Sequence, residues 1–503
     1  MREFSITIEE PFQNGLRPDE TFRTREGFLE ECFNMVPNRF GLEEYELTED
    51  PFDGGVTVNL PFPQVFRGRD LTLMFQATTL SAVTVSTDPW TVSGITTYDP
   101  AAPTSTKAIT SSGAWHFIDL GPSFYAFNGA CTVFRPGFHL FTGAATTTFV
   151  NSSVTIKTGC EYRGRVFLGG FDKANIWDTA WGDVFTEFKA EAGVDEITFD
   201  DDGPGPNWVM WSSIGGGDFP FWLMFPKGFS DLPLGLSKEA VLQKMKQNTF
   251  GWAPLRHAGN VVVMKPLGDA IIVYGDEGIE ALIPQGTNVG FRRIANFGIL
   301  GRGAVDSDGD SHLFLDAEGH LWRMGSDLGL ERLGHREWLS SFSATSTAIV
   351  YSPVDRQFLI SEPGQGYVLK DGRLAEHNQQ VSTLIHKDGV PYGVGVTGAS
   401  TNVRVMTGAL DLRRQALKTL HDVQIDYSDI TALKVEVLYR NDHTSSFKTV
   451  GAKLVGPEGV LTTMLTAREF KLRITGTPGN NPRITSVELR WNLVDKRAVR
   501  GQY

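Results

Sequence analysis

The segment Tyr367-Val-Leu-Lys-Asp-Gly-Arg-Leu374 places an acidic residue and a glycine between two short apolar runs. Glycine adopts the positive φ of a tight hairpin turn without steric cost, so this pattern predicts two antiparallel strands joined by Asp371-Gly372. The same form occurs at 273–282, 314–322 and 384–392. The sequence therefore predicts a series of short β-hairpins.

The spacing of these turns indicates a repeat. Gly278, Gly319 and Gly372 are separated by 41 and 53 residues, and a four-stranded propeller blade occupies roughly 40 to 50 residues. Short segments rich in β-branched and aromatic residues, each closed by a turn residue, continue from about Leu71 to Met406. We expect an all-β fold with a β-propeller-like body of about seven blades.

The flanking regions differ from this body. Residues 1–65 are rich in proline and predict an extended arm with one short helix around Thr24–Phe33, docked on the body or on a neighbour. Residues 66–408 form the predicted propeller body, with helical insertions at 183–192 and 237–248. Apolar and polar residues alternate from 409 to 495, which predicts a separate β-sandwich, and 496–503 form a basic C-terminal tail.

Charge is unevenly distributed along the 503 residues. From Ala409 onward the chain carries 15 Lys and Arg against 10 Asp and Glu, whereas the preceding part carries 31 against 49. An acidic body does not neutralise phosphates, so ordinary nucleic-acid wrapping is not expected there; simple solubility explains the charge as well. The absence of an apolar leader, of a long apolar segment and of paired cysteines predicts a protein made in the cytoplasm without a membrane span.

The sequence contains no convincing match to a motif for catalysis, cofactor binding or metal binding. Gly393-Val-Gly-Val-Thr-Gly398 matches a dinucleotide-binding pattern but precedes a strand-like run rather than a helix, so no cofactor is expected. Asp306, Asp308 and Asp310 alternate as in a calcium loop, yet the glycine and glutamate positions of such a loop are not matched. A hairpin turn explains these carboxylates better. No nucleophile elbow, zinc-protease motif or P-loop is present, so we expect no enzyme.

Two segments are candidate interfaces between subunits. Residues 208–229 contain three Trp and four Phe together with a glycine run, and interfaces are enriched in aromatic residues. A core position is the main alternative for them. The basic tail is the second candidate segment. The interface candidates are Phe219, Phe221, Trp222, Phe225, Arg497 and Arg500.

Several further segments follow one another in a recognisable order. They are Glu31–Gly41, Trp115-His-Phe117 with Asn128-Gly129, Tyr162–Phe167, Trp208–Ser213, Gly298–Val305 and Arg468–Gly476. As loose patterns that cover nearly the whole chain, they resemble the propeller-type tail proteins of short-tailed bacteriophages, namely the tail nozzle (tail tubular protein B) and the packaged-DNA stabilisation proteins.

This resemblance implies a structural protein of the virion tail. Six copies would form a ring below the portal and adaptor proteins, retain the packaged double-stranded DNA, and conduct it during ejection without reading its sequence. The ring would carry tail fibres or a needle. Two other functions remain open: a phage receptor-binding or glycan-binding propeller, and a polysaccharide hydrolase with two carboxylates in one pocket.

Overall fold

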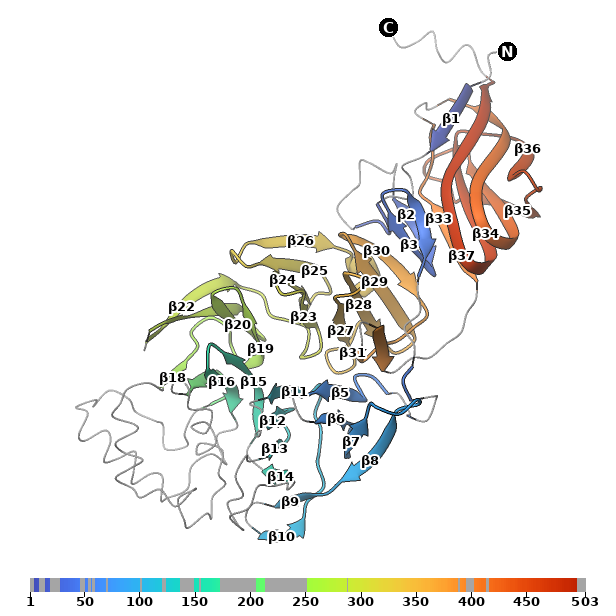
Figure 1. The fold of residues 1–503 in the computed structure, drawn as a ribbon. Helices are drawn as coiled ribbons and strands as arrows, with labels where there is room; N and C mark the ends of the chain where they lie inside the picture. Colours follow the sequence, from blue (N-terminus) through green and yellow to red (C-terminus); the bar gives the residue numbers. More distant parts are fainter. Residues whose placement is uncertain are drawn as a thin grey trace.

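The computed structural model describes residues 4–8, 14–18, 28–45, 50–52, 56, 59–68, 71–99, 102–119, 124–135, 149–152, 155–171, 205–212, 251–286, 288–387, 390–394, 402–412 and 416–494. These residues form an elongated molecule made of strands, and the only helix among them is α4, Arg336–Leu339 (Figure 1). The all-β prediction is confirmed. Within the same residues, no helix has the length and apolar character that crossing a bilayer requires. The helices predicted at 183–192 and 237–248 lie outside them.

The propeller-like body consists of small antiparallel sheets that follow one another along the chain, here called blades 1 to 7. The strands of blades 1 to 3 are β5 (Gln64–Arg67), β6 (Thr72–Phe75), β7 (Leu80–Thr84) and β8 (Thr91–Ile95); β11 (His116–Asp119), β12 (Phe124–Phe127), β13 (Thr132–Arg135) and β14 (Phe149–Ser152), extended by β9 (Thr97–Asp99) and β10 (Ala102–Thr106); β15 (Ile156–Tyr162), β16 (Arg165–Phe171), β17 (Trp208–Trp211) and β18 (Gly251–Pro254).

Blades 4 to 7 continue the same order of strands. They comprise β19 (Val261–Leu267), β20 (Ala270–Gly275), β21 (Ile279–Gln285) and β22 (Asn288–Ala295); β23 (Val305–Ser307), β24 (Ser311–Leu315), β25 (Leu321–Gly325) and β26 (Leu330–Gly334); β27 (Ala348–Ser352), β28 (Gln357–Glu362), β29 (Gln365–Lys370) and β30 (Arg373–His377); β31 (Thr383–Lys387) and β32 (Val390–Val394).

The innermost strands of the blades, β5, β11, β15, β19, β23, β27 and β31, surround one axis. Contacts join β11 to β15, β15 to β19, β23 to β27, β27 to β31, and β31 back to β5 (Figure 1). Blades 1 and 2 are also joined where the backbone N–H of Trp115 donates to Gln64 Oε1 at 2.5 Å. Blades 4 and 5 are joined by an ion pair of Lys265 with Asp306. The ring is therefore closed through seven blades.

The predicted hairpins are present, but their glycines serve two purposes. Gly319 and Gly372 adopt φ of +84° and +76°, the conformation that the turns require. Gly278 does not, and a Cβ there would collide with the carbonyl oxygen of His257. Gly278 and Gly319 occupy equivalent turns, between the second and third strands of blades 4 and 5. Gly372 lies instead between the third and fourth strands of blade 6.

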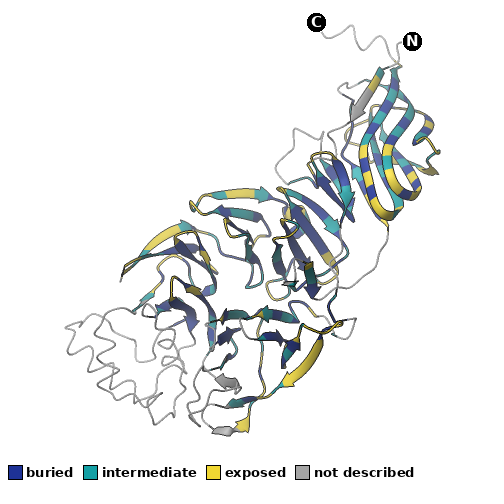
Figure 2. Cartoon of the chain, viewed as in Figure 1, coloured by how far each residue is buried: buried dark blue, intermediate teal, exposed yellow. Residues whose placement is uncertain are grey.

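The C-terminal sandwich is built around two long strands, β34 (Lys418–Arg440) and β37 (Glu469–Leu493), which pair along their length. The register of this pair shifts near Asp429 and Ala432, which have positive φ of 53° and 50°. Before this bend β34 pairs with β36 (Val460–Ala467), and after it with β35 (Lys448–Leu454). Buried and exposed residues alternate along these strands, as predicted (Figure 2).

The N-terminal arm joins the propeller to the sandwich. Its strand β2 (Leu29–Phe33) pairs with β30 of blade 6 and with β33 (Val403–Thr407), which in turn pairs with β37. The strands β1 (Phe4–Ile8) and β4 (Gly41–Glu44) also pair with β37, and β3 (Met35–Asn38) pairs with β4. One continuous sheet therefore runs from the propeller into the sandwich.

The helix predicted around Thr24–Phe33 is wrong over 29–33, because these residues form β2. Two open sheet edges offer backbone partners at this position, and such pairing overrides a weak local helix preference. Residues 24–27 lie outside the described part of the chain. Of the two predicted docking partners for the arm, the described segments contact the chain's own body.

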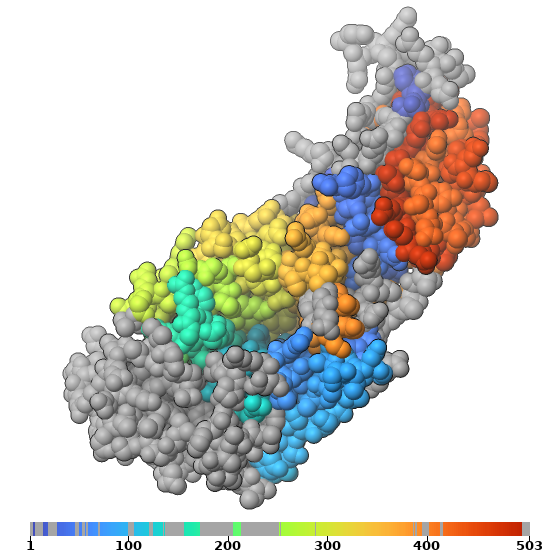
Figure 3. Space-filling model, viewed as in Figure 1, coloured from blue at the N-terminus to red at the C-terminus, as the bar shows by residue number. Residues whose placement is uncertain are grey.

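One hydrophobic core spans the join. It contains buried side chains from blades 4 to 6, from the arm and from the sandwich, including Ile272, Leu359, Leu29, Val405 and Leu472. The seam between blades 7 and 1 has a smaller, separate core around Val65, Trp90 and Ile385. The space-filling view shows the arm segments wedged between the propeller and the sandwich at the narrow part of the molecule (Figure 3).

Candidate functional site in the axial cavity

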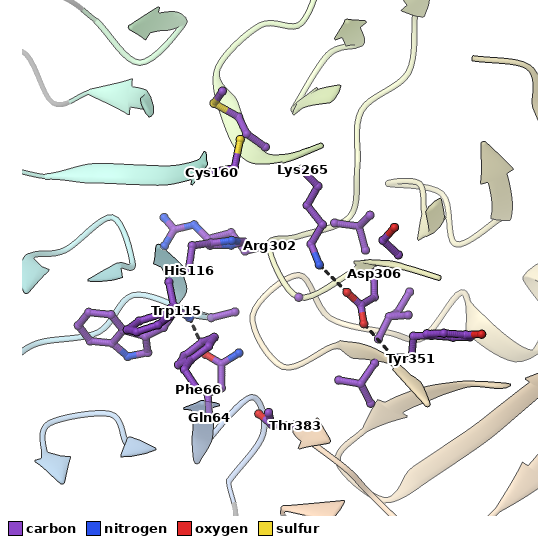
Figure 4. A pocket seen from close by; sticks show the side chains of 18 of the residues that line it. Gln64, Phe66, Trp115, His116, Cys160, Lys265, Arg302, Asp306, Tyr351 and Thr383 are labelled. Carbon is purple, nitrogen blue, oxygen red and sulfur yellow. Dashed lines mark hydrogen bonds and ion pairs between the residues drawn. The ribbon is translucent and has the colours of Figure 1, made fainter. Parts of the chain in front are cut away.

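A cavity of about 820 Å³ lies on the propeller axis, and the innermost strands of all seven blades line it (Figure 4). Small-molecule sites occupy about 300 to 1,000 Å³, so its size is that of a ligand pocket. Its walls combine apolar and polar residues. The side chains used below are Phe66, His116, Phe117, Lys265, Arg302 and Asp306.

Arg302 reaches across this axis. It lies in the loop before β23 of blade 5, yet its guanidinium packs on Gly129, in the turn between β12 and β13 of blade 2. A Cβ at Gly129 would collide with this guanidinium, and the φ of Gly129 is +79°. Only glycine therefore accepts the backbone conformation and leaves room for the arginine.

The turn that receives Arg302 is fixed by Asn128, which is completely buried. Its side-chain oxygen accepts the backbone N–H groups of Ala130 and Cys131 at 2.8 and 3.0 Å, and its Nδ2 donates to the carbonyl of Thr110. The N–H of Gly129 donates to Ile156 in blade 3. These hydrogen bonds fix the conformation of the Asn128-Gly129 turn on which the guanidinium of Arg302 packs.

His116 lies next to Arg302 on the same wall of the cavity (Figure 4). Its Nε2 is buried and has no hydrogen-bond partner among the described residues, and the same is true of Nη1 of Arg302. Burial, together with Lys265 and Arg302, lowers the pKa of His116 to about 3, so the imidazole is neutral. Burial also lowers the pKa of Arg302 to about 10.

Arg302 has no ion pair with any carboxylate in the described part of the chain. Lys157 on β15 is a further positive neighbour of Arg302, and its pKa is lowered by burial and by Arg302. A desolvated guanidinium without an anion is unfavourable. The axis therefore carries positive charge that no carboxylate among the described residues neutralises.

The opposite wall carries a neutralised pair. Lys265 Nζ lies 2.6 Å from Asp306 Oδ1, while Asp306 Oδ2 accepts the backbone N–H of Tyr351 at 2.8 Å (Figure 4). Both carboxylate oxygens are thus engaged, which links blades 4, 5 and 6. Asp306 is therefore not available to neutralise Arg302.

The three aspartates that alternate in the sequence have different surroundings. Asp308 accepts the N–H groups of Asp310 and Ser311 at 2.9 and 2.6 Å and so closes the hairpin between β23 and β24, with Gly309 at φ +96°. Asp306 points to Lys265 instead. The described residues contain no group of three side chains arranged to hold a metal ion.

Most of the other candidate residues cannot be placed relative to this cavity. Phe219, Phe221, Trp222, Phe225, Arg497 and Arg500 lie outside the described residues. Gly393 belongs to β32, and Gly398 lies outside them.

Sequence reasoning did not identify Arg302, His116 or Lys265 as site residues. The segments that contain His116, Asn128-Gly129 and Arg302 were selected for their resemblance to phage tail proteins, and the fold brings all three together at one place. Their approach depends on the packing of blades 2 and 5 around one axis, which no local pattern specifies.

No family model matches the sequence, and no curated protein matches it. Solved structures with a similar fold include PorZ of the type-IX secretion system of Porphyromonas gingivalis, with 10% identity and a TM-score of 0.32 over 71% of this chain and 36% of PorZ. AztD from Citrobacter koseri has 11% identity and a TM-score of 0.31, covering 83% of this chain and 90% of AztD.

A third similar structure is the extracellular domain of a putative hybrid two-component system, BT4673 of B. thetaiotaomicron. It has 12% identity and a TM-score of 0.35 over 94% of this chain and 66% of that domain. The chain thus spans about a third of the PorZ chain and about two thirds of the extracellular domain of BT4673. These similarities concern the β-rich fold alone and carry no argument about function.

Proposed function

We propose that this protein is a structural component of the tail of a short-tailed bacteriophage, a nozzle or hub rather than an enzyme. Six copies would form a ring below the portal and adaptor proteins, retain packaged double-stranded DNA and conduct it during ejection. The ring would also carry tail fibres or a needle. The proposal rests on the resemblance of the sequence segments to this family, and the architecture supplies its physical support.

The structural observation that best supports the proposal is the continuous sheet through β2. Backbone pairing joins blade 6 to the arm, the arm to β33 and β33 to the sandwich, and one core follows the same path. Two modules joined in this way resist relative rotation better than modules joined by a flexible linker. A ring that retains DNA under pressure needs subunits of this stiffness.

Charge supports the same function. The acidic part of the chain, before Ala409, would repel a phosphate backbone and let DNA slide without adhering to the wall. The axial cavity has the size of a small-molecule pocket, so the DNA path would run between subunits and not through the propeller of one subunit. Closed six-fold rings use two different patches on each subunit, and an acidic body with a basic tail offers such a pair.

The decisive experiment measures the mass of the purified full chain, alone and with portal and adaptor proteins, followed by electron microscopy of the particles. We expect closed hexameric rings, formed either spontaneously or on the portal. A chain that stays monomeric in the presence of portal and adaptor, and binds a glycan instead, would favour the receptor-binding alternative.

A variant tests the charge contribution separately. Arg497→Glu with Arg500→Glu should weaken ring assembly and reduce its dependence on salt, because both changes remove positive charge from the tail. Arg292→Glu with Arg293→Glu, on the exposed strand β22, provides a control with the same change in net charge. Equal assembly of both double variants at every salt concentration would exclude the tail from the interface.

A further inference from the structure

We propose that the axial cavity of the propeller binds a small organic anion, a molecule that carries a carboxylate or phosphate group, with Arg302 as its cationic partner. This site is independent of the proposed ring, because every residue that forms it belongs to one subunit.

The first support is the uncompensated charge. The guanidinium of Arg302 lies against Gly129 with Nη1 buried and unpaired, and no described carboxylate forms an ion pair with it. Arginine presents a planar set of N–H donors that fits carboxylate and phosphate oxygens in pairs. An anion would supply the acceptors that the described residues do not.

The second support is the neighbouring donor. His116 is neutral, its Nε2 is buried, and no described residue accepts or donates a hydrogen bond there. A neutral imidazole can donate one N–H, so His116 and Arg302 can bind the same anion from one wall. Among the described residues, the charges that act on His116 are the positive groups of Lys265 and Arg302, which disfavour a cation there.

The carboxylates near the cavity are engaged elsewhere. Asp306 accepts from Lys265 and Tyr351, and Glu161 accepts the N–H of Gly164 in its own hairpin turn at 2.8 Å. Asp119 is exposed and has a partner of its own. None of them neutralises Arg302, whereas Lys157 adds a further positive charge beside it.

The third support concerns the rest of the ligand. Phe66 and Phe117 stack with ring centroids 5.2 Å apart and line the same cavity, and both are half-buried. A volume of about 820 Å³ is larger than an inorganic ion needs. An anion with a flat or apolar body would use both the cationic wall and the aromatic wall.

The test is calorimetric titration of the full-length protein with benzoate, phenyl phosphate, inorganic phosphate and benzamide at low ionic strength. Benzamide has the shape of benzoate without its charge. We expect benzoate or phenyl phosphate to bind at least about tenfold more tightly than benzamide, since a charge-assisted pair is lost with the neutral molecule. Inorganic phosphate separates the contribution of the anion from that of the aromatic body.

Variants locate the site. Arg302→Met should weaken binding of the anionic probes at least about tenfold, while Arg293→Met, an exposed arginine on β22, should leave binding unchanged. His116→Phe should give a smaller loss. In anion-free buffer Arg302→Met should melt at a higher temperature than the parent protein, because an unpaired desolvated charge has been removed.

Equal affinity for benzoate and benzamide in the parent protein would overturn the proposal, whether or not any variant folds. So would equal binding of the anions by the parent protein and Arg302→Met. A lower melting temperature of Arg302→Met without anion would show that the guanidinium is already satisfied, and would likewise contradict the site.

Discussion

Arginine side chains lie both at the propeller axis and at the junction of the arm with the sandwich, but only those at the junction have carboxylate partners. Arg473 contacts Glu31 at 3.2 Å and Glu436 at 2.9 Å, and Arg404 contacts Glu31 at 3.2 Å. Arg302 at the axis has no such partner in the described part of the chain. The same residue type therefore serves a structural purpose in one region and remains available for a ligand in the other.

The pKa values follow this difference. Burial alone would lower the pKa of Arg473, but Glu31 and Glu436 raise it above its ordinary value. At the axis nothing opposes burial, and the pKa of Arg302 falls. A junction that must hold two modules together needs paired charges, whereas a cavity with an unpaired charge is prepared for an anion.

The largest loss of stability is expected from a substitution in the hydrophobic core where the arm joins the propeller to the sandwich. Leu29→Ala removes a completely buried side chain of β2, the strand that pairs with β30 of blade 6 and with β33, which leads to the sandwich. We expect the free energy of unfolding to fall by about 2–5 kcal/mol. Urea denaturation measures this, with the exposed Val92→Ala on β8 as the control. A loss no larger than that of Val92→Ala would show that β2 does not hold the modules together.

A second set of variants tests the contact between Arg302 and Gly129 at the propeller axis. Gly129→Ala places a Cβ at φ +79° against the guanidinium of Arg302, and the backbone strain alone costs about 1–2 kcal/mol. Adding Arg302→Ala removes the collision, so the double variant should be less destabilised than the sum of the two single variants, by about 0.5–3 kcal/mol. Thermal or chemical denaturation of all four proteins measures this coupling. Strict additivity would mean that Arg302 does not cross the axis.

A third prediction uses pH at the sandwich end. Lys418, the completely buried first residue of β34, donates to the carbonyl of Asp411, and burial lowers its pKa to about 8, below the ordinary lysine value. Between these two pKa values the unfolded chain binds more protons than the folded protein, so stability rises with pH.

We expect a gain of about 1 kcal/mol between pH 7 and 9, because the folded-state pKa of about 8 lies inside this range and the ordinary lysine value lies above it. Denaturation of the parent protein and of Lys418→Met across this range measures it, and the slope should be smaller in the variant. Identical slopes would refute the contribution of Lys418.

The smallest effect concerns the ion pairs of the junction. Glu31→Gln leaves Arg404 without its partner and Arg473 with Glu436 alone. Because these side chains are partly exposed, we expect a loss of about 0.5 kcal/mol, which decreases at high salt. Denaturation at low and high ionic strength provides the measurement. A loss that does not change with salt would indicate a packing effect instead.

Local patterns were sufficient for the hairpins and the alternating strands of the sandwich. Asp371-Gly372 occupies a turn with positive φ at both residues, as its sequence predicts. The spacing of such turns was less informative, because Gly372 belongs to a different hairpin of its blade than Gly319. Leu29–Phe33 was predicted as a helix and is a strand, since its partners β30 and β33 lie far away in the sequence.

The sequence by itself determined an all-β chain, the glycine-turned hairpins, the alternation of the long C-terminal strands and the separation of acidic and basic segments. These follow from backbone conformational preference and from the two-residue period of a strand, which are local properties. Only the tertiary structure decided that β2 joins two modules and that Arg302 meets His116 and Gly129 across one axis. Such contacts depend on how blades close into a ring, and Arg302 lies 173 residues after Gly129 and 186 residues after His116.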